Sequence, residues 1–202
     1  MSGKRFIWII CSIFFSHGDR VFDFFIVPSG SKMNARKPAR RQVFLHSRRA
    51  QEKDIPRLIE LLEQVLQIHA DIRPDIFIPG TTKYTNEELA EMIKDDTKPI
   101  YVAADDDDDD ICMGYAFCQI RQQPFSNNMV PFTSLFIDDL CVDSKTRGAH
   151  IGEQLFEYVK NEAKHLGCYE VTLNVWSGNT SAEKFYEKMG LKTKERQMEY
   201  IL

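Results

Sequence analysis

The chain has 202 residues, of which 43% are hydrophobic and 28% charged, and its formal net charge is −4 at pH 7. This length and apolar fraction suit one globular domain with a substantial core, and the negative charge argues against nucleic acid or an anionic membrane as the main partner. The five cysteines form no Cys-x-x-Cys pair and have no histidine at ligand spacing. We therefore expect no metal and a reducing, cytoplasmic compartment.

The first 42 residues differ in composition from the rest of the chain. The apolar run 6–15 imitates the core of a signal peptide but lacks a small-x-small cleavage site and is too short to span a bilayer. A second apolar patch, 21–27, leads into a basic run. We expect residues 1–42 to be an extension outside the domain; disorder of this extension and a true start at Met33 are both compatible with that expectation. Membrane attachment is the alternative.

Regular patterns begin at residue 43. A first strand is predicted over 43–50, and a helix follows that Asp54 caps and that has Pro56 in its first turn. Thr85 and Glu88 form a capping box for a second, short helix. Apolar residues at helical spacing predict the buried side of the first helix: Ile55, Leu58, Ile59, Leu62, Val65 and Leu66.

Two further strands are predicted at 99–103 and 111–120, with six consecutive aspartates, 105–110, between them. Like charges in a row repel one another and predict a solvated hairpin turn. Calcium binding is the alternative, but the glycine and the distal glutamate of a calcium loop are missing. Strands are also predicted at 134–142, 169–175 and 197–202.

Residues 139–152 lead from the end of a strand through a charged turn into a long helix that ends at Gly167. The first turn of a helix offers free N–H groups to an anion, Gly148 and Gly152 allow a ligand to approach the backbone, and Arg147 adds a cation. A phosphate site is therefore one reading, and a generic strand-to-helix turn is the other. The stretch fits neither a mononucleotide loop nor a dinucleotide loop.

A second motif, Asn179-Thr-Ser-Ala-Glu-Lys-Phe-Tyr-Glu-Lys-Met-Gly190, follows one strand later. Together with Arg147-Gly148-Ala149-His150-Ile151-Gly152 it resembles the GNAT superfamily of N-acetyltransferases, which carries Gln/Arg-x-x-Gly-x-Gly/Ala and then Asn-x-x-Ala-x-x-Phe-Tyr-x-x-x-Gly. One position departs from the pattern, because His150 replaces the first motif glycine. Its side chain must point away from a pyrophosphate, and the motif assignment holds only if its backbone keeps a conformation that does not require glycine.

The resemblance implies an α/β (α+β) fold over residues 43–202, with a mixed, mostly antiparallel central sheet of six to seven strands flanked by about four helices. Only residues 191–196 separate Gly190 from the last predicted strand, so the family's final hairpin is abbreviated here. A homodimer in which a second subunit completes the acceptor site is therefore a hypothesis.

The resemblance also implies transfer of an acetyl group from acetyl-CoA to a primary amine by direct attack in a ternary complex. The backbone of Leu140, Cys141 and Val142 would pair with pantetheine, and Asn179 would cap its helix or bind the pantetheine arm. The acceptor would be a small molecule, such as a polyamine, an aminosugar or an amino acid, or a protein N-terminus. The residues implied for the pyrophosphate are Arg147, Gly148, Ala149, His150, Ile151 and Gly152.

Two groups are expected to move protons. Tyr186 matches the family's general acid, with a packing role in the core as its alternative. Asp138 and Asp139 lie beside the reacting carbonyl, and strand alternation predicts that only one faces the site; we favour Asp139 as the base, with a structural role as the alternative. His69, Arg73, Asp75 and Tyr84 could contact an acceptor, with a surface or loop-anchoring role as the favoured alternative for each. A non-catalytic module that senses acyl-CoA is the alternative function.

Overall fold

The computed structural model describes residues 45–106, 111–124, 126–146 and 148–202. The predicted extension, 1–42, lies outside these ranges, as do four of the six aspartates and Arg147. The strands are β1 Leu45–Arg49, β2 Ile100–Asp105, β3 Cys112–Gln122, β4 Thr133–Val142 and β5 Glu170–Leu173. The helices are α1 Ile55–Ile72, α2 Asn86–Ile93, α3 Ile151–His165 and α4 Thr180–Lys188, with short 3₁₀ turns at Glu52–Asp54 and Ser144–Thr146.

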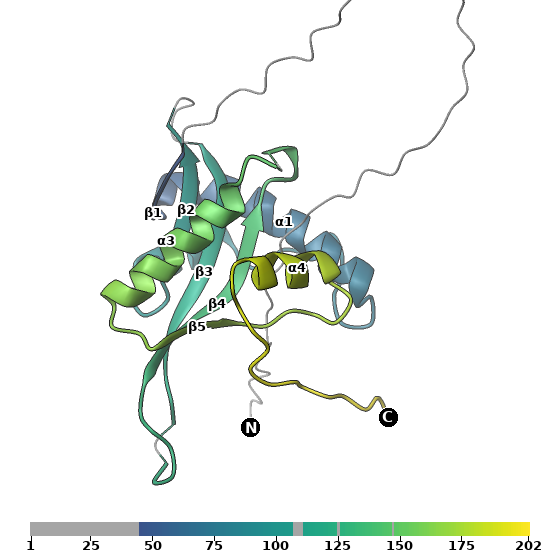
Figure 1. The fold of residues 1–202 in the computed structure, drawn as a ribbon. Coiled ribbons are helices and arrows are strands. Elements are labelled where there is room, and N and C mark those ends of the chain that lie inside the picture. Colours follow the sequence, from purple (N-terminus) through teal and green to yellow (C-terminus); the bar gives the residue numbers. More distant parts are fainter. Residues whose placement is uncertain (1–44, 107–110, 125, 147) are drawn as a thin grey trace, which may run out of the picture.

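The five described strands form one sheet in the order β1-β2-β3-β4-β5. The first three pairings are antiparallel, and β4 pairs with β5 in parallel. The prediction of a mixed, mostly antiparallel sheet with four helices is therefore confirmed. Helix α3 crosses one face of the sheet while α1 lies behind the other (Figure 1). The protein is thus built in three layers, with a core on each side of the sheet.

Two apolar clusters fill these layers. One joins Leu155, Phe156 and Val159 of α3 with Phe185 of α4 and the facing side of the sheet. The other joins the buried side of α1 and Leu89 of α2 with the opposite side of the sheet. The predicted stripe of α1 is largely confirmed, because Ile55, Leu58, Leu62 and Val65 are buried, together with Leu61.

The six-to-seven-strand prediction is wrong at the C-terminal end of the described chain, where residues 191–202 form neither helix nor strand. A strand requires a backbone partner, but this tail contacts the domain through side chains. Lys194 bonds to Glu170 at 2.6 Å, and Arg73 bonds to Glu199 at 2.7 Å. Tyr200 is 88% exposed, so the apolar residues of the tail do not line one side of a sheet.

Two predictions about acidic residues also need correction. Asp54 precedes α1 but does not cap it, because its carboxylate accepts hydrogen bonds from Arg48 and the backbone N–H of Gln51. The aspartate run does not lie wholly in a turn either. Asp105 is the last residue of β2 and is buried, with its N–H donating to Ile111 O. The rest of the run, 107–110, lies outside the described residues.

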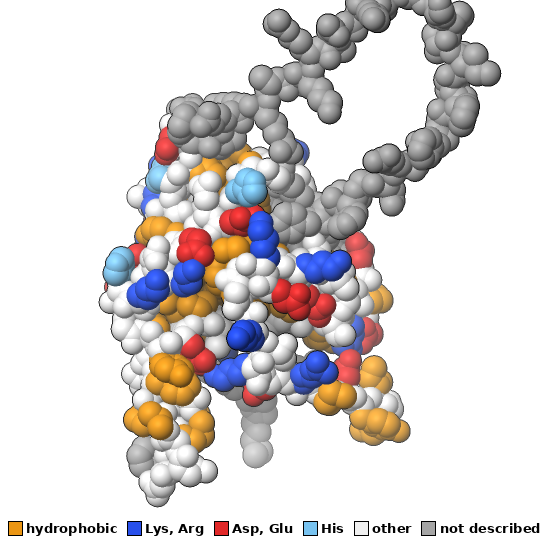
Figure 2. Space-filling view, in the orientation of Figure 1, with side chains coloured by type: hydrophobic (Ala, Val, Ile, Leu, Met, Phe, Trp, Pro, Cys, Tyr) orange, Lys and Arg blue, Asp and Glu red, His pale blue; other side chains and the backbone are white. Residues whose placement is uncertain are grey.

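The surface on the side of α3 and α4 carries acidic and basic side chains close together rather than in one-sign patches (Figure 2). Apolar side chains gather at its two lower tips, the β3–β4 loop and the C-terminal tail. Val130 of this loop is 78% exposed. In the described part of the chain, no helix is long and apolar enough to cross a membrane.

Candidate functional site

Strand β4 continues beyond the end of its pairing with β5. Residues Ser134–Ile137 of β4 pair with Glu170–Leu173 of β5, whereas β4 continues to Val142. Beyond Ile137, none of the described strands pairs with β4 on the side away from β3. On that side, the backbone of Leu140, Cys141 and Val142 therefore has no partner among the described strands. An extended ligand could pair with such a strand segment as another strand would.

A β-bulge in β4 lies where the pairing of β4 with β5 ends. Phe117 of β3 is opposite Asp139, and the next residue, Cys118, is opposite Ile137, so Asp138 is the extra residue. Ile137 and Leu140 both lie in the cluster under α3. The two aspartates between them therefore both face α1 and α2. The prediction that alternation sends them to opposite faces is wrong, because the bulge interrupts the alternation.

Asp139 is a completely buried carboxylate. Its Oδ2 accepts a hydrogen bond from the Tyr115 hydroxyl at 3.1 Å, while Oδ1 is buried and has no hydrogen-bond partner within the described chain. Burial raises the pKa of Asp139 to about 7, against the opposing attraction of Lys83. A carboxylate in this state can take up or release a proton near neutral pH.

Lys83, from the segment between α1 and α2, reaches these carboxylates. Its Nζ donates to Asp138 Oδ2 at 3.0 Å and lies 4.9 Å from the centre of the Tyr84 ring. Gln119 Nε2 donates to the other oxygen of Asp138 at 3.2 Å. Burial lowers the pKa of Lys83, but Asp139 and Asp138 raise it more, so the net shift is upward.

The four residues predicted for the acceptor wall lie in three different environments. Tyr84 stacks on Phe117 with ring centres 5.8 Å apart and belongs to the carboxylate cluster. His69 is buried, and burial together with the charge of Lys83 lowers its pKa to about 4, so it is neutral at physiological pH. Arg73 forms ion pairs with Asp75 and with Glu199 of the tail, each at 2.7 Å. Arg73 and Asp75 therefore belong to a surface ion-pair network and not to the carboxylate cluster.

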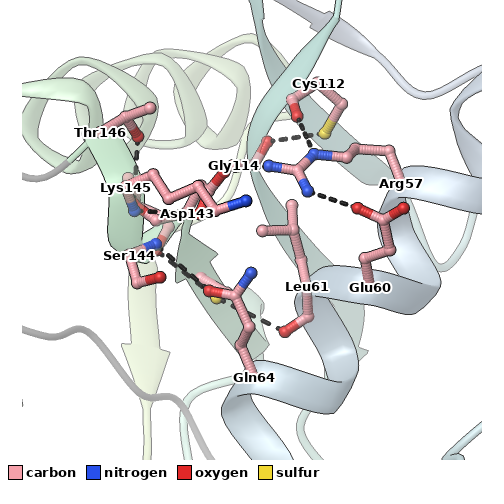
Figure 3. Close-up of polar contacts among 12 residues, drawn as sticks. Arg57, Glu60, Leu61, Gln64, Cys112, Gly114, Asp143, Ser144, Lys145 and Thr146 are labelled. Carbon is pink, nitrogen blue, oxygen red and sulfur yellow. Dashed lines mark hydrogen bonds and ion pairs between the residues drawn. The ribbon is translucent and has the colours of Figure 1, made fainter.

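The turn that follows β4 is tied to α1, as Figure 3 shows. Asp143 accepts hydrogen bonds from the backbone N–H of Lys145 at 3.0 Å and from Arg57 Nη2. The same arginine donates from Nε to the carbonyl of Cys112 at 3.1 Å. Gln64 accepts from the N–H of Ser144 at 3.2 Å. Side chains of α1, with Arg57 also bound to the backbone of β3, thus hold the start of the predicted pyrophosphate loop.

The residues before α3 adopt left-handed backbone conformations. Gly148 has φ 78°, and His150 has φ 60° and is the only non-glycine residue with positive φ in the described chain. His150 therefore adopts the left-handed conformation that favours glycine, and the condition set for the motif assignment is not met there, although histidine is among the side chains that tolerate this region best. The ring of His150 is exposed and bonds to Glu153 at 3.0 Å. Residues 148–152 lead directly into the first turn of α3.

Helix α4 carries the two remaining predicted residues. Asn179 is its N-cap, with Oδ1 accepting from the N–H of Ala182 at 3.1 Å. Tyr186 is 3% exposed, and its ring lies 5.2 Å from that of Phe185 and 6.1 Å from that of Phe156. The structure therefore places Tyr186 in the core beneath α3, on the side of the sheet opposite the aspartates.

Sequence reasoning missed Lys83, Tyr115 and Gln119. The last two were accessible from the pattern, because residues 115, 117 and 119 of a regular strand share one face and lie opposite the aspartates. Lys83 had no such signal: it lies in an irregular loop, and only the folded chain brings it to β4. The described residues contain no group of three or more His, Cys, Asp or Glu side chains that could hold a metal ion.

The protein has three layers, a strand β4 that continues past the end of β5, and a glycine-containing turn into α3. Together these features define an acetyltransferase fold. Residues 62–191 match the model of the acetyltransferase (GNAT) family, and the chain belongs to that family. The family uses acyl-CoA as its donor.

Among relatives, the chain is 39% identical over 62 residues to glucosamine 6-phosphate N-acetyltransferase of Arabidopsis thaliana; this match spans 31% of the chain and 40% of the relative. The BH1408 protein from Bacillus halodurans, solved as a tetramutant, has a TM-score of 0.72 and 25% identity, covering 78% of this chain and 99% of that one. A structure of glucosamine-6-phosphate N-acetyltransferase from Arabidopsis thaliana has a TM-score of 0.58 and 26% identity, covering 78% and 98% respectively.

Proposed function

We propose that this protein transfers an acetyl group from acetyl-CoA to a primary amine by direct attack within a ternary complex. The observation that carries the proposal is the bulge in β4. The buried carboxyl of Asp139, with a pKa of about 7, follows this bulge directly and lies next to the strand segment 140–142. On the side away from β3, this segment has no strand partner among the described residues. A proton acceptor and a place for the donor's extended arm thus lie side by side.

The cofactor would occupy two adjoining regions. Pantetheine would pair with the backbone of Leu140, Cys141 and Val142, and a backbone N–H near Val142 would polarise the thioester carbonyl. The pyrophosphate would lie at residues 147–152, where the start of α3 offers N–H groups and the positive end of the helix dipole. Asn179 already caps α4, and the pantetheine arm passing nearby would be its second contact.

Gly152 provides a test of this placement. A Cβ there would lie 3.5 Å from the side chain of Val142 and 3.6 Å from that of Phe185, which is ordinary contact. We expect Gly152→Asp to fold but to bind CoA at least about tenfold more weakly, because it puts an anion against the pyrophosphate. Calorimetry would measure the affinity, with Gly152→Ala as the uncharged control. Equal CoA affinity in the wild type and the Asp variant would refute the placement.

Two side chains would handle protons. An alkyl ammonium with a pKa near 10.4 costs roughly 4 kcal/mol to present as a free amine at neutral pH. Asp139 is the proposed acceptor of that proton, directly or through a water molecule. Tyr186 is the proposed donor to the departing CoA thiolate, a role that competes with its packing in the core.

The acceptor has two candidates, each with its own observation. The relatives from Arabidopsis thaliana act on glucosamine 6-phosphate, which favours an aminosugar phosphate. A shallow surface depression beside Tyr84 is lined by Glu87, Glu88, Glu91 and Met92. The negative charge of these glutamates favours a cationic amine without phosphate.

A thiol-release assay with acetyl-CoA and a panel of amines tests the activity and separates the candidates. The panel should contain glucosamine 6-phosphate, unphosphorylated glucosamine and a linear polyamine. We expect amine-dependent release of CoA with at least one of them. CoA binding without turnover of any amine would instead support a non-catalytic acyl-CoA sensor.

A further inference from the structure

One amine of the chain already lies beside Asp138 and within the field of the proposed base, Asp139. Lys83 Nζ is 3.0 Å from Asp138 Oδ2, and the Lys83 side chain is only 16% exposed. It approaches the bulge of β4 from the side of α1 and α2, the side that both aspartates face. The rings of Tyr84 and Phe117 lie 4.9 Å and 5.9 Å from Nζ. These groups surround the ammonium with two carboxylates and two aromatic rings.

We propose that Lys83 is a site of self-acetylation, in which its own Nζ accepts the acetyl group from acetyl-CoA bound along β4. The proposal rests on the proposed function, since the donor must lie beside Leu140–Val142. It extends that function to an acceptor within the chain. Among the lysines with a described ion pair, Lys83 alone pairs with an aspartate of β4.

The transfer is balanced without a further reactant. Lys83 first loses one ammonium proton to the Asp139 carboxylate, and the neutral nitrogen then attacks the thioester carbonyl carbon. The new C–N bond forms as the C–S bond breaks. The CoA thiolate leaves with the bonding electron pair and takes up the second nitrogen proton, so the products are an acetamide on Lys83 and CoA thiol.

The surroundings of Lys83 predict that this reaction is slow and becomes faster as the pH rises. Asp138 and Asp139 hold the ammonium in its charged form, which raises the pKa of Lys83, and Tyr84 and neutral His69 are the other titratable groups that face it. The reactive neutral amine is therefore a small fraction at neutral pH. One chain can be modified only once at this position, so the reaction ends at one acetyl group per Lys83.

The experiment uses the full chain with acetyl-CoA and no added amine, and peptide mass spectrometry measures acetylation site by site. Lys98, whose side chain is 54% exposed, is the internal control for chemical acetylation. We expect occupancy at Lys83 to saturate with acetyl-CoA, to fall when excess CoA competes, and to have a rate independent of protein concentration. Acetylation of Lys98 should rise linearly with the concentration of acetyl-CoA and should not change when excess CoA is added.

Two variants make the test specific. Lys83→Arg keeps the cation beside the aspartates and should abolish the saturable acetylation, with Lys98 unchanged. Asp139→Asn, which cannot take the proton, should slow modification of Lys83 by about tenfold or more. Modification of Lys83 that is linear in acetyl-CoA and insensitive to CoA would overturn the proposal, as would an unmodified Lys83.

Failure of this inference and failure of the proposed function look different. If the thiol-release panel shows turnover of an amine while Lys83 stays unmodified, the acetyltransferase assignment stands and only self-acetylation is refuted. If calorimetry detects no CoA binding to the wild-type chain, both are refuted together. Acetylation of Lys83 without turnover of any panel amine would support the inference and point to an acceptor outside the panel.

Discussion

Asp139 shows how burial can shift the pKa of one carboxyl towards neutrality. A carboxyl in water is ionised at neutral pH, but this one is completely buried, and the loss of hydration raises its pKa to about 7. The Tyr115 hydroxyl and the positive charge of Lys83 oppose the shift without cancelling it. Asp143, which is also buried, has a lowered pKa because hydrogen bonds from the Lys145 N–H and Arg57 outweigh its burial.

The raised pKa of Asp139 predicts opposite pH effects on activity and stability. As the proposed base it must be ionised, so kcat/KM should rise with pH and level off above about pH 7, and Asp139→Asn should lose most of the rate. The folded chain binds this proton more tightly than the unfolded chain. The free energy of unfolding should therefore decrease as the pH rises from about 4, near the unfolded pKa, to about 7.

Thermal unfolding checks the stability effect. The melting temperature of Asp139→Asn relative to the wild type should increase across that pH window, because the Asn side chain avoids the burial of a charge. Asp138→Asn is the matched control, since the side chain of Asp138 is less buried and is paired with Lys83. A difference in melting temperature that does not change with pH would contradict the assignment.

Tyr186 allows a separate test of chemistry against packing. Tyr186→Phe keeps the ring between Phe156 and Phe185 and removes only the hydroxyl. If the hydroxyl protonates the CoA thiolate, the maximal rate should fall roughly 10²-fold while CoA affinity and melting temperature change little. Tyr186→Ala, the control for packing, should lose several kcal/mol of stability. A fully active Phe variant would leave water as the proton donor.

At the scale of elements, the start of the turn between β4 and α3 is anchored to α1. Asp143 is its anchor, because its carboxylate binds both the backbone N–H of Lys145 within the turn and Arg57 on α1. Where a loop must present N–H groups to a pyrophosphate, such anchoring removes motion that would otherwise be lost on binding. Gly114 allows β3 to lie close to this end of β4, since a Cβ there would be 2.7 Å from Cys141 O.

Asp143→Asn should therefore weaken CoA binding by about tenfold and lower the melting temperature, because Arg57 loses its buried ionic partner. The matched control is Glu60→Gln. Glu60 bonds to the same arginine at 2.5 Å but is 62% exposed, and exposed pairs contribute little. Calorimetry with CoA and thermal unfolding measure the two effects. Equal CoA affinities for the two variants would show that the anchor does not position the loop.

At the scale of the whole molecule, the described residues form a core on each side of the sheet. Both clusters are assembled from residues between Ala50 and Tyr186. A homodimer that completes the acceptor site remains a hypothesis, which light scattering after size exclusion would decide.

Deletion of residues 1–32 should leave a folded protein that binds CoA with unchanged affinity. The measurement is the melting temperature and the CoA affinity of the shortened chain beside the full-length one. A drop of several degrees in melting temperature would show that the apolar runs 6–15 and 21–27 pack against the domain. That result would refute the prediction that they lie outside it.

Several features followed from local sequence alone. The capping box of Thr85 and Glu88, the Asn179 cap and the apolar side of α1 depend on neighbours within one helix turn, so the pattern predicted them correctly. The paired motifs at 147–152 and 179–190 also led to the family, because close backbone approach and helix starts restrict which residues fit.

Only the tertiary structure decided the composition of the site. The β-bulge at Asp138 depends on the register between β3 and β4, and that register turns both aspartates to one face. Lys83 reaches them across 55 residues of chain, and no local pattern encodes such a contact. The same reason explains the missing sixth strand, because residues 197–202 have a strand's composition but find no backbone partner, and a strand exists only where another strand accepts its hydrogen bonds.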